Sequence, residues 1–306
     1  MTQPTGPEAS GPSVYHLRNQ HWPLAQYPSD LQYEAYSAVG YDLANSMLLL
    51  GHKTTNGTRK DREWIIVDTL GSGDSAMEAI KAFKKQIYGA ESNWPAKIPL
   101  RAIIYTHNHI DHTAGVRGYL AASDKPPCPS DYSGSAGPDR HFNVDKEAVL
   151  STGAPCVAVI GQVNINSAIV NTSTVVGSII DPRSGYMYGN FVPAAHVNSG
   201  IGPQEGTTKI RAPSVQVEPK VPPVGPGPVH PDGASSYYMP SRTFTQQLKV
   251  TAAGIHLQLI YTPSETDDEI IAFVPDMHNG KGAAPKFDKK DCQRAGLTSD
   301  HHRAAG

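Results

Sequence analysis

Apolar residues along the chain fall into short runs separated by polar stretches, which is the pattern of a domain that mixes strands and helices. Two runs, at residues 41–50 and 64–70, flank a polar segment and predict an antiparallel pair of strands. A further run at 101–105 predicts a short buried strand, and residues 155–160 predict another. With the helix that separates the second and third runs, these strands predict a layered α/β structure.

Between residues 70 and 100 the apolar positions change to helical spacing. Ser75 and Glu78 have the spacing of a capping box, so we expect the helix to begin beside them. Its apolar face would carry Met77, Ile80, Phe83 and Ile87. Further along the chain, residues 248–259 alternate about Gly254 as a hairpin with one buried face does. Residues 269–275 predict one more strand.

Four stretches lack such patterns and set the expected domain organisation. Residues 1–13 are rich in Pro, Gly and Ser and predict a disordered N-terminus. The segments 123–140 and 200–241 predict loose loops, and we interpret the second as an insertion. Residues 279–306 contain too few large apolar side chains to offset their ordering entropy, so they predict a disordered tail. The folded domain is therefore expected at 14–278.

Composition excludes several classes of function. With 26 Lys+Arg and 28 Asp+Glu the formal net charge is −2, so the basic surface that nucleic-acid binding requires is missing. No apolar run approaches the roughly 18–20 residues that cross a bilayer, which argues against a membrane protein. The N-terminus has no pattern of a secretory signal, which favours the cytoplasm. Cys128, Cys156 and Cys292 are widely spaced and odd in number, and predict reduced thiols.

The densest chemical signal lies in residues 106–115, directly after the run at 101–105. On an extended backbone His107 and His109 point the same way, so they can converge on one metal ion. As the chain turns, Asp111 and His112 reach the same region and could hold a second ion. Imidazole nitrogen and carboxylate oxygen suit Zn²⁺, and less exclusively Fe or Mn. The alternative is a polar loop whose histidines only form hydrogen bonds or face solvent.

The pattern His-x-His-x-Asp-His after an apolar strand, with Asp68 at the end of an earlier strand, resembles the metallo-β-lactamase superfamily. This resemblance implies an α/β (α+β) fold, the αββα sandwich, with a dinuclear site at one edge of the sheets. It also implies that Asp68 supports the metal ligands from behind. Taken without the resemblance, Asp68 could be a simple strand-to-turn carboxylate.

Four further segments, in the same order along the chain, are similar to the alkyl/aryl-sulfatase branch, which includes dodecyl-sulfate hydrolases. They are residues 40–45, 114–118, 186–190 and 263–269. The resemblance covers about residues 35–277. It favours this branch over the lactonases, glyoxalases and nucleases of the same superfamily.

The branch resemblance extends the expected ligand set. The Glu of the segment Pro-Ser-Glu matches Glu265, which would join His107 and His109 on the first metal. Three nearby carboxylates compete for this role or form a charged turn: Asp267, Asp268 and Glu269. The implied cofactor is Zn²⁺, with two ions at each site in the family.

The same resemblance implies a substrate and a reaction. The substrate would be a small alkyl sulfate, hydrolysed to alcohol and sulfate by a metal-activated water. Asp111 and His112 would serve catalysis as well as metal binding. Tyr188 and Asn190 would border the sulfate pocket, although Tyr186 and Tyr188 could equally form an aromatic pair at a strand edge.

After Met277 the resemblance stops. The branch continues with a strand that carries a bridging Glu, a further ligand His and a helical dimerisation domain, whereas residues 280–285 contain no acidic side chain. We therefore expect a truncated chain with an incomplete sandwich, without the dimerisation region of the homodimeric family and without the later ligands of the second metal. Another ester or lactone hydrolase, and a catalytically inactive metal-binding remnant, both stay open as alternatives.

Overall fold

The computed structural model describes residues 13–16, 33–52, 62–130, 137–187 and 236–274. All of them belong to one compact unit, residues 1–274. The disordered N-terminus predicted at 1–13 lies outside the described residues, except for Ser13, which begins the first strand. The predicted tail at 279–306 lies outside them entirely.

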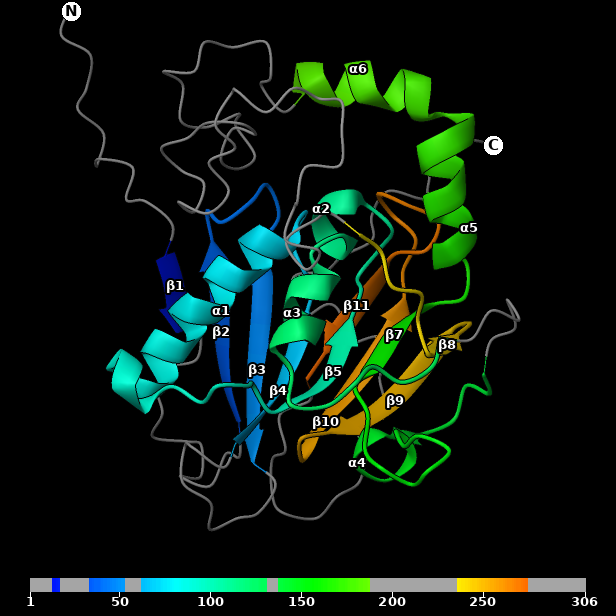
Figure 1. Ribbon diagram of the computed structural model, residues 1–306. Coiled ribbons are helices and arrows are strands. Elements are labelled where there is room, and N and C mark those ends of the chain that lie inside the picture. Colours follow the sequence, from blue (N-terminus) through cyan, green and yellow to red (C-terminus); the bar gives the residue numbers. More distant parts are fainter. Residues whose placement is uncertain (1–12, 17–32, 53–61, 131–136, 188–235, 275–306) are drawn as a thin grey trace, which may run out of the picture. The chain divides into compact units, whose positions relative to one another are not determined.

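The strands form two sheets (Figure 1). The seven-stranded sheet has the order β1-β2-β3-β4-β5-β7-β8. Its strands are β1 (Ser13–His16), β2 (Tyr33–Val39), β3 (Ser46–His52), β4 (Arg62–Val67), β5 (Leu100–Ile104), β7 (Ala158–Gln162) and β8 (Arg242–Phe244). The four-stranded sheet has the order β11-β10-β9-β6. Its strands are β11 (Ile270–Phe273), β10 (Ile255–Tyr261), β9 (Gln247–Ala252) and β6 (Phe142–Asn143).

The described helices all lie between β4 and β8 in sequence. The α-helices are α1 (Gly73–Tyr88), α2 (Ile110–Thr113), α3 (Val116–Ala122), α4 (Val144–Glu147), α5 (Ile165–Val170) and α6 (Gly177–Met187). The turn η4 (Glu91–Asn93) follows α1, and the π-helical turn η5 (Asn171–Val175) joins α5 to α6. None of the helices in the described part of the chain combines the length and the apolar character needed to cross a membrane.

The central strands are buried on both faces because they lie between two apolar layers. In β4, Trp64 and Ile66 belong to the apolar cluster that includes helix α1, whereas Ile65 and Val67 belong to the cluster that includes the four-stranded sheet. This alternation follows from the two-residue period of a strand. Strand β5 runs parallel to β4 and to β7. Helix α1 provides the crossover from β4 to β5, and the segment with α2, α3 and α4 provides the one from β5 to β7.

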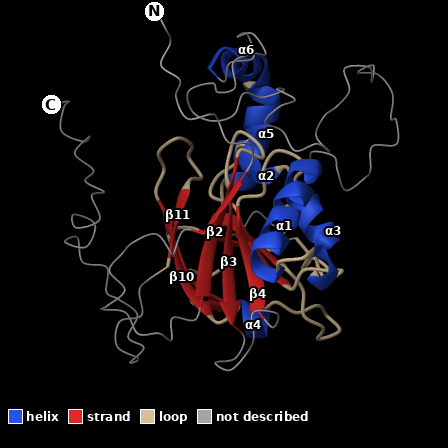
Figure 2. Ribbon diagram, turned by 90° about the vertical axis from the view of Figure 1, so that its left-hand side faces the viewer, coloured by secondary structure: helices blue, strands red, loops and turns tan. Residues whose placement is uncertain are grey.

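Helices α1 and α3 cover one face of the seven-stranded sheet, and the four-stranded sheet packs against the other face (Figures 1 and 2). The predicted mixed α/β sandwich is therefore confirmed. Within the described residues, the outer face of the smaller sheet exposes Gln247, Lys249 and His256, while Leu248 and Leu257 turn inward. The predicted hairpin about Gly254 is the β9–β10 pair.

Two sequence predictions need correction at the boundaries of elements. Residues 41–45 form a turn before β3, so the strand begins at Ser46; its antiparallel pairing with β4 is as expected. Helix α1 starts at Gly73, and its cap is Ser72, whose hydroxyl oxygen accepts a hydrogen bond from the Ser75 backbone N–H at 3.1 Å. Ser72, three residues before Ser75, therefore performs the capping that we expected of Ser75.

The prediction of reduced thiols is wrong for Cys128 and Cys156, which form a disulfide with their Cα atoms 5.0 Å apart. Spacing along the sequence could not show this, because a short parallel bridge between Pro127 and Val157 brings the two residues together. Both cysteines are buried in the cluster between the sheets. The disulfide thus ties part of the segment 123–140 to the start of β7.

We predict that the unfolded, unreduced protein has one alkylatable thiol out of its three cysteines, and three after reduction. Replacing both Cys128 and Cys156 by Ser should lower the free energy of unfolding by about 3–4 kcal/mol, because the disulfide closes a loop with a sequence separation of 28. Mass spectrometry and urea unfolding measure the two effects. The exposed Ser151 lies within the loop, so Ser151→Ala is the control and should change neither. Three reactive thiols without reductant would contradict the pairing.

Candidate metal centre

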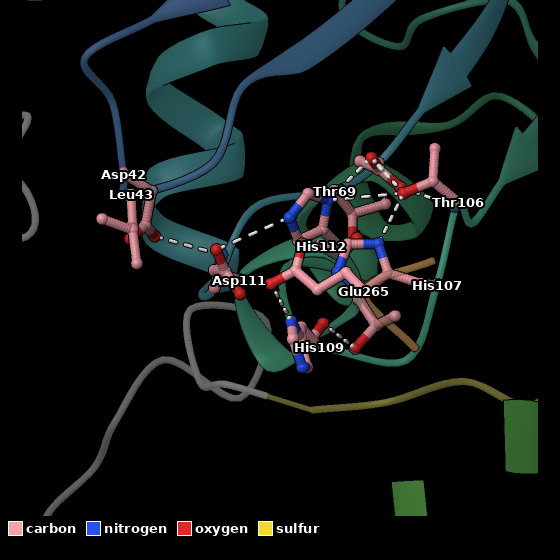
Figure 3. A network of polar contacts seen from close by, with 12 residues as sticks. Asp42, Leu43, Thr69, Thr106, His107, His109, Asp111, His112 and Glu265 are labelled. Atoms are coloured by element: carbon pink, nitrogen blue, oxygen red, sulfur yellow. Dashed lines mark hydrogen bonds and ion pairs between the residues drawn. The ribbon is translucent and has the colours of Figure 1, made fainter. Parts of the chain in front are cut away.

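Three segments meet at one edge of the sandwich and carry the predicted metal ligands (Figure 3). The loop after β5 leads into α2 and carries His107 and His109. The turn after β4 carries Asp68, and the loop between β10 and β11 carries Glu265. The parallel pairing of β4 with β5 places the ends of these two strands side by side, so their following turns are neighbours.

The first group of ligands consists of His107, His109 and Glu265. One potential ligand atom of each lies within 4.8 Å of the others, with 3.4 Å between Nδ1 of His109 and Oε1 of Glu265. His107 has its Nδ1 3.0 Å from the hydroxyl oxygen of Thr106, while its buried Nε2 has no hydrogen-bond partner in the described part of the chain. A buried ring nitrogen without a hydrogen-bond partner is suited to coordinate a metal ion. The group can therefore hold one metal ion.

The second group consists of Asp111 and His112, whose Oδ2 and Nε2 atoms are 3.6 Å apart. It lies directly beside the first, because the ring centroids of His107 and His112 are 4.0 Å apart. Among the residues that the structure describes, no third His, Cys, Asp or Glu forms with this pair a group as close as the first. Two protein ligands alone make a weak zinc site.

Asp68 lies behind both groups and holds them through hydrogen bonds. Its Oδ2 accepts from Nδ1 of His112 and from the Thr106 hydroxyl, both at 2.8 Å. Its Oδ1 accepts from the Thr106 backbone N–H, also at 2.8 Å. Because Nδ1 of His112 is engaged by Asp68, its Nε2 remains available on the side of Asp111. Asp68 thus contacts one expected ligand, His112, and the residue before His107, while its support of a bound metal stays a prediction.

The turn after β4 has a costly backbone conformation. Asp68 and Leu70 have φ angles of 60° and 68°, in the left-handed region that residues other than glycine rarely adopt. Backbone hydrogen bonds hold this turn, from the Asp68 N–H to Ile104 at 2.9 Å and from the Thr69 N–H to His112 at 2.7 Å. The surrounding structure therefore fixes a strained turn at the site, which aims Asp68 toward the ligand loop.

Gly115 allows the ligand loop to approach this turn. A Cβ atom at position 115 would lie 2.0 Å from the backbone oxygen of Thr69 and 2.7 Å from that of Ser72. The Gly115 N–H also donates to the backbone oxygen of Leu70 at 2.7 Å. Only glycine fits between these backbone atoms, which explains the residue that follows the histidine motif.

The two neighbouring histidines have pKa values shifted in opposite directions. Burial and the nearby charge of His112 lower the pKa of His107 to about 4, so its ring is neutral at pH 7 and can coordinate a metal. Burial alone would lower the pKa of His112, but the hydrogen bond to Asp68 and the charges of Asp68 and Asp111 raise it to about 9. A metal that binds Nε2 of His112 must therefore replace a proton. Burial also raises the pKa of Asp111.

The structure separates the remaining predicted residues. Tyr188 and Asn190 lie outside the described residues, and Tyr186 belongs to helix α6 rather than to a strand edge. Of the three competing carboxylates near Glu265, none belongs to the first ligand group: Asp267 is exposed, Asp268 is buried, and Glu269 bonds to the turn itself.

Sequence reasoning missed one residue of the site, Thr106. Its backbone N–H and its hydroxyl both bond to Asp68, and its hydroxyl also lies 3.0 Å from His107. The signal was its position directly before the first histidine at the end of a buried strand. At this position the side chain of Thr106 lies between the ligand His107 and the carboxylate of Asp68.

A two-sheet sandwich with a group at its edge that could hold a metal ion, His107, His109 and Glu265, has the architecture of the metallo-β-lactamase type. The profile of the family described as "Metallo-beta-lactamase superfamily" matches residues 58–245, which is more than half of the chain. The chain belongs to this superfamily.

Its relatives include enzymes that act on sulfate esters. The chain is 27% identical over 212 residues to a linear primary-alkylsulfatase of a Pseudomonas species, covering 69% of this chain and 29% of that protein. It is 27% identical over 191 residues to the alkyl/aryl-sulfatase BDS1 of Saccharomyces cerevisiae, covering 61% of this chain and 23% of that protein. These relatives confirm the resemblance to the alkylsulfatase branch. The chain spans less than a third of their length.

A solved structure is also similar to this chain. It is that of the stereoselective inverting sec-alkylsulfatase Pisa1 from Pseudomonas sp., with a TM-score of 0.49 and 19% sequence identity. The match covers 79% of this chain and 28% of that one.

We predict that Asp68→Ala weakens zinc binding about 10–100-fold, because the orientation and tautomer of His112 depend on this carboxylate. The substitution also leaves the donors of Thr106 and His112 without their acceptor, which should cost about 1–3 kcal/mol of stability. Competition with a metal chelator and thermal unfolding measure the two effects. Asp124, an exposed carboxylate away from the ligands, provides the control Asp124→Ala. Equal zinc affinities of the Asp68 variant and the parent protein would contradict the supporting role.

Proposed function

We propose that this protein is a metal-dependent hydrolase of alkyl sulfate esters, which converts an alkyl sulfate and water to an alcohol and sulfate. The observation that carries the proposal is the placement of His107, His109 and Glu265 as one ligand group beside Asp111 and His112. The relatives named as alkylsulfatases supply the substrate class. The expected cofactor is Zn²⁺, with two ions when both groups are filled.

Each ligand group would contribute differently to this reaction. His107, His109 and Glu265 would hold the first ion, and Asp111 with His112 would hold the second. Zinc, when bound, lowers the pKa of a water molecule to near 7 and stabilises the charge that develops on the sulfate oxygens. No serine or cysteine nucleophile is then required. Asp68 keeps the proton on Nδ1 of His112, so that Nε2 faces the metal side.

Apolar surface beside the ligands suits the alkyl chain of the substrate. Ile110 begins helix α2 between the two ligand groups, and its side chain is 68% exposed. Each CH₂ group of a substrate that is buried against such surface contributes about 0.8 kcal/mol. The partner that we propose is therefore a small amphiphilic anion, neither a nucleic acid nor a membrane.

The disulfide between Cys128 and Cys156 is unusual for a protein of a reducing compartment such as the cytoplasm. The proposed function therefore does not extend to a cytoplasmic location.

A second candidate function is metal binding without catalysis. It is favoured by the pair Asp111 and His112, to which the described residues add no third ligand. In this case the first group would bind one ion, and the second ion would be held weakly. The two candidates differ in metal content and in turnover.

We predict that the zinc-loaded full-length protein releases sulfate from dodecyl sulfate and binds two zinc ions per chain. His107→Ala and Glu265→Ala should abolish sulfate release because each removes a ligand of the first metal. His256→Ala is the matched control, since this exposed histidine lies on the outer face of the four-stranded sheet. Sulfate release by ion chromatography and metal content by mass spectrometry are the measurements.

The same assay separates the alternatives. Turnover of nitrophenyl esters or lactones without sulfate release would indicate another hydrolase of the superfamily. One zinc ion per chain, with no turnover of any substrate after zinc loading, would support metal binding without catalysis.

A further inference from the structure

We propose that Glu269 is a positioning residue for the first metal: its carboxylate holds the backbone of Glu265 so that the Glu265 side chain reaches the side of His109. This inference deepens the proposed function and rests on the assignment of Glu265 as a ligand. It gives a role to one of the three carboxylates that the sequence left as competing ligands.

Both hydrogen bonds of the Glu269 carboxylate go to the ligand-bearing turn and end on one oxygen atom. Oε2 of Glu269 accepts from the backbone N–H of Glu265 at 2.7 Å and from the hydroxyl of Ser264 at 2.6 Å. The carboxylate of Glu269 is therefore engaged by the turn, and the metal group contains Glu265 instead.

The backbone of Glu269 closes the same turn. Its carbonyl oxygen accepts from the Thr262 N–H at 2.9 Å, and its N–H donates to the carbonyl oxygen of Thr266 at 3.3 Å. The next residue, Ile270, donates its N–H to the carbonyl oxygen of Thr106 at 2.9 Å. The turn is thus fixed by Glu269 and attached to the residue that precedes His107.

Glu265 needs such a fixed backbone because little else restrains its side chain. That side chain is 56% exposed, so packing does not select its conformation. Its Oε1 lies 3.4 Å from Nδ1 of His109, on a loop from a different sheet. A ligand on a mobile turn would have to be ordered again for each binding event, at a cost in metal affinity. Glu269 removes this cost by holding the turn before the metal arrives.

The test compares zinc affinity in two substitutions of Glu269. Glu269→Ala removes both hydrogen bonds and should weaken binding of the first zinc ion about 10–100-fold, the range found for groups that orient metal ligands. Glu269→Gln keeps a carbonyl oxygen that can accept both bonds, so its affinity should stay within about threefold of the parent protein. Asp267→Ala removes an exposed carboxylate from the same turn and is the matched control, with unchanged affinity expected.

Two measurements separate positioning from a general loss of structure. Zinc affinity is obtained by chelator competition on the full chain, at a temperature where circular dichroism shows every variant to be folded. The absorption spectrum of the cobalt-substituted protein reports the ligand set directly, and it should change in Glu269→Ala but not in Glu269→Gln. Parent-like affinity and spectrum in Glu269→Ala would overturn the proposal. Equal loss in Glu269→Ala and Glu269→Gln would overturn it too, because the charge rather than the turn would then matter.

Failure of this inference is distinguishable from failure of the proposed function. If Glu265→Ala leaves zinc affinity unchanged, Glu265 is not a ligand and the positioning role of Glu269 is refuted. If the parent protein binds zinc through Glu265 and shows the expected Glu269 pattern, yet releases no sulfate, the positioning role stands and only the hydrolase proposal fails.

Discussion

The site depends on the hydrogen bonds that the Asp68 carboxylate accepts from Thr106 and His112. These bonds join the turn after β4 to the loop after β5, at the point where two buried parallel strands end. The turn itself has a left-handed backbone at Asp68, a conformation that persists only where the surrounding structure holds it. If the carboxylate were lost, the tautomer of His112 would no longer be fixed, and the N–H and hydroxyl of Thr106 would lose their acceptor. Both ligand groups would lose their common support.

Packing of the two sheets brings the loop with Glu265 and Glu269 to the loop that carries the histidines. The histidine motif comes from the seven-stranded sheet, whereas Glu265 and Glu269 come from the loop that precedes β11 of the four-stranded sheet. Packing of the two sheets through the apolar cluster between them brings these loops to one edge. The bond from Ile270 to Thr106 then connects the two sheets directly beside the ligands. Burial of apolar area thus positions polar groups that have little attraction for one another without a metal.

The two ligand groups differ in how completely this chain provides them. Among the described residues, the first group has three potential ligands, one of them with a buried nitrogen that lacks a hydrogen-bond partner. The second has two, and the hydrogen bond and charge of Asp68 raise the pKa of its histidine to about 9. Zinc binding at the first group therefore faces less competition from protons than binding at the second. This asymmetry explains why hydrolysis and metal binding without catalysis are separate outcomes of zinc loading.

The sequence by itself determined the features that depend on local periodicity. Alternation and helical spacing identified β3, β4, α1, β5 and the β9–β10 hairpin. The two-residue period predicted that His107 and His109 can converge on one ion, whereas the structure brings them together across bends at 106–108 rather than along an extended strand. Only the tertiary structure decided that Cys128 meets Cys156 and that Ser72 rather than Ser75 caps the helix. The family resemblance had pointed to Glu265, and the fold of the two sheets places it beside His109. The physical reason is that periodicity describes one element at a time, whereas contacts between elements follow from strand pairing, sheet packing and loop closure.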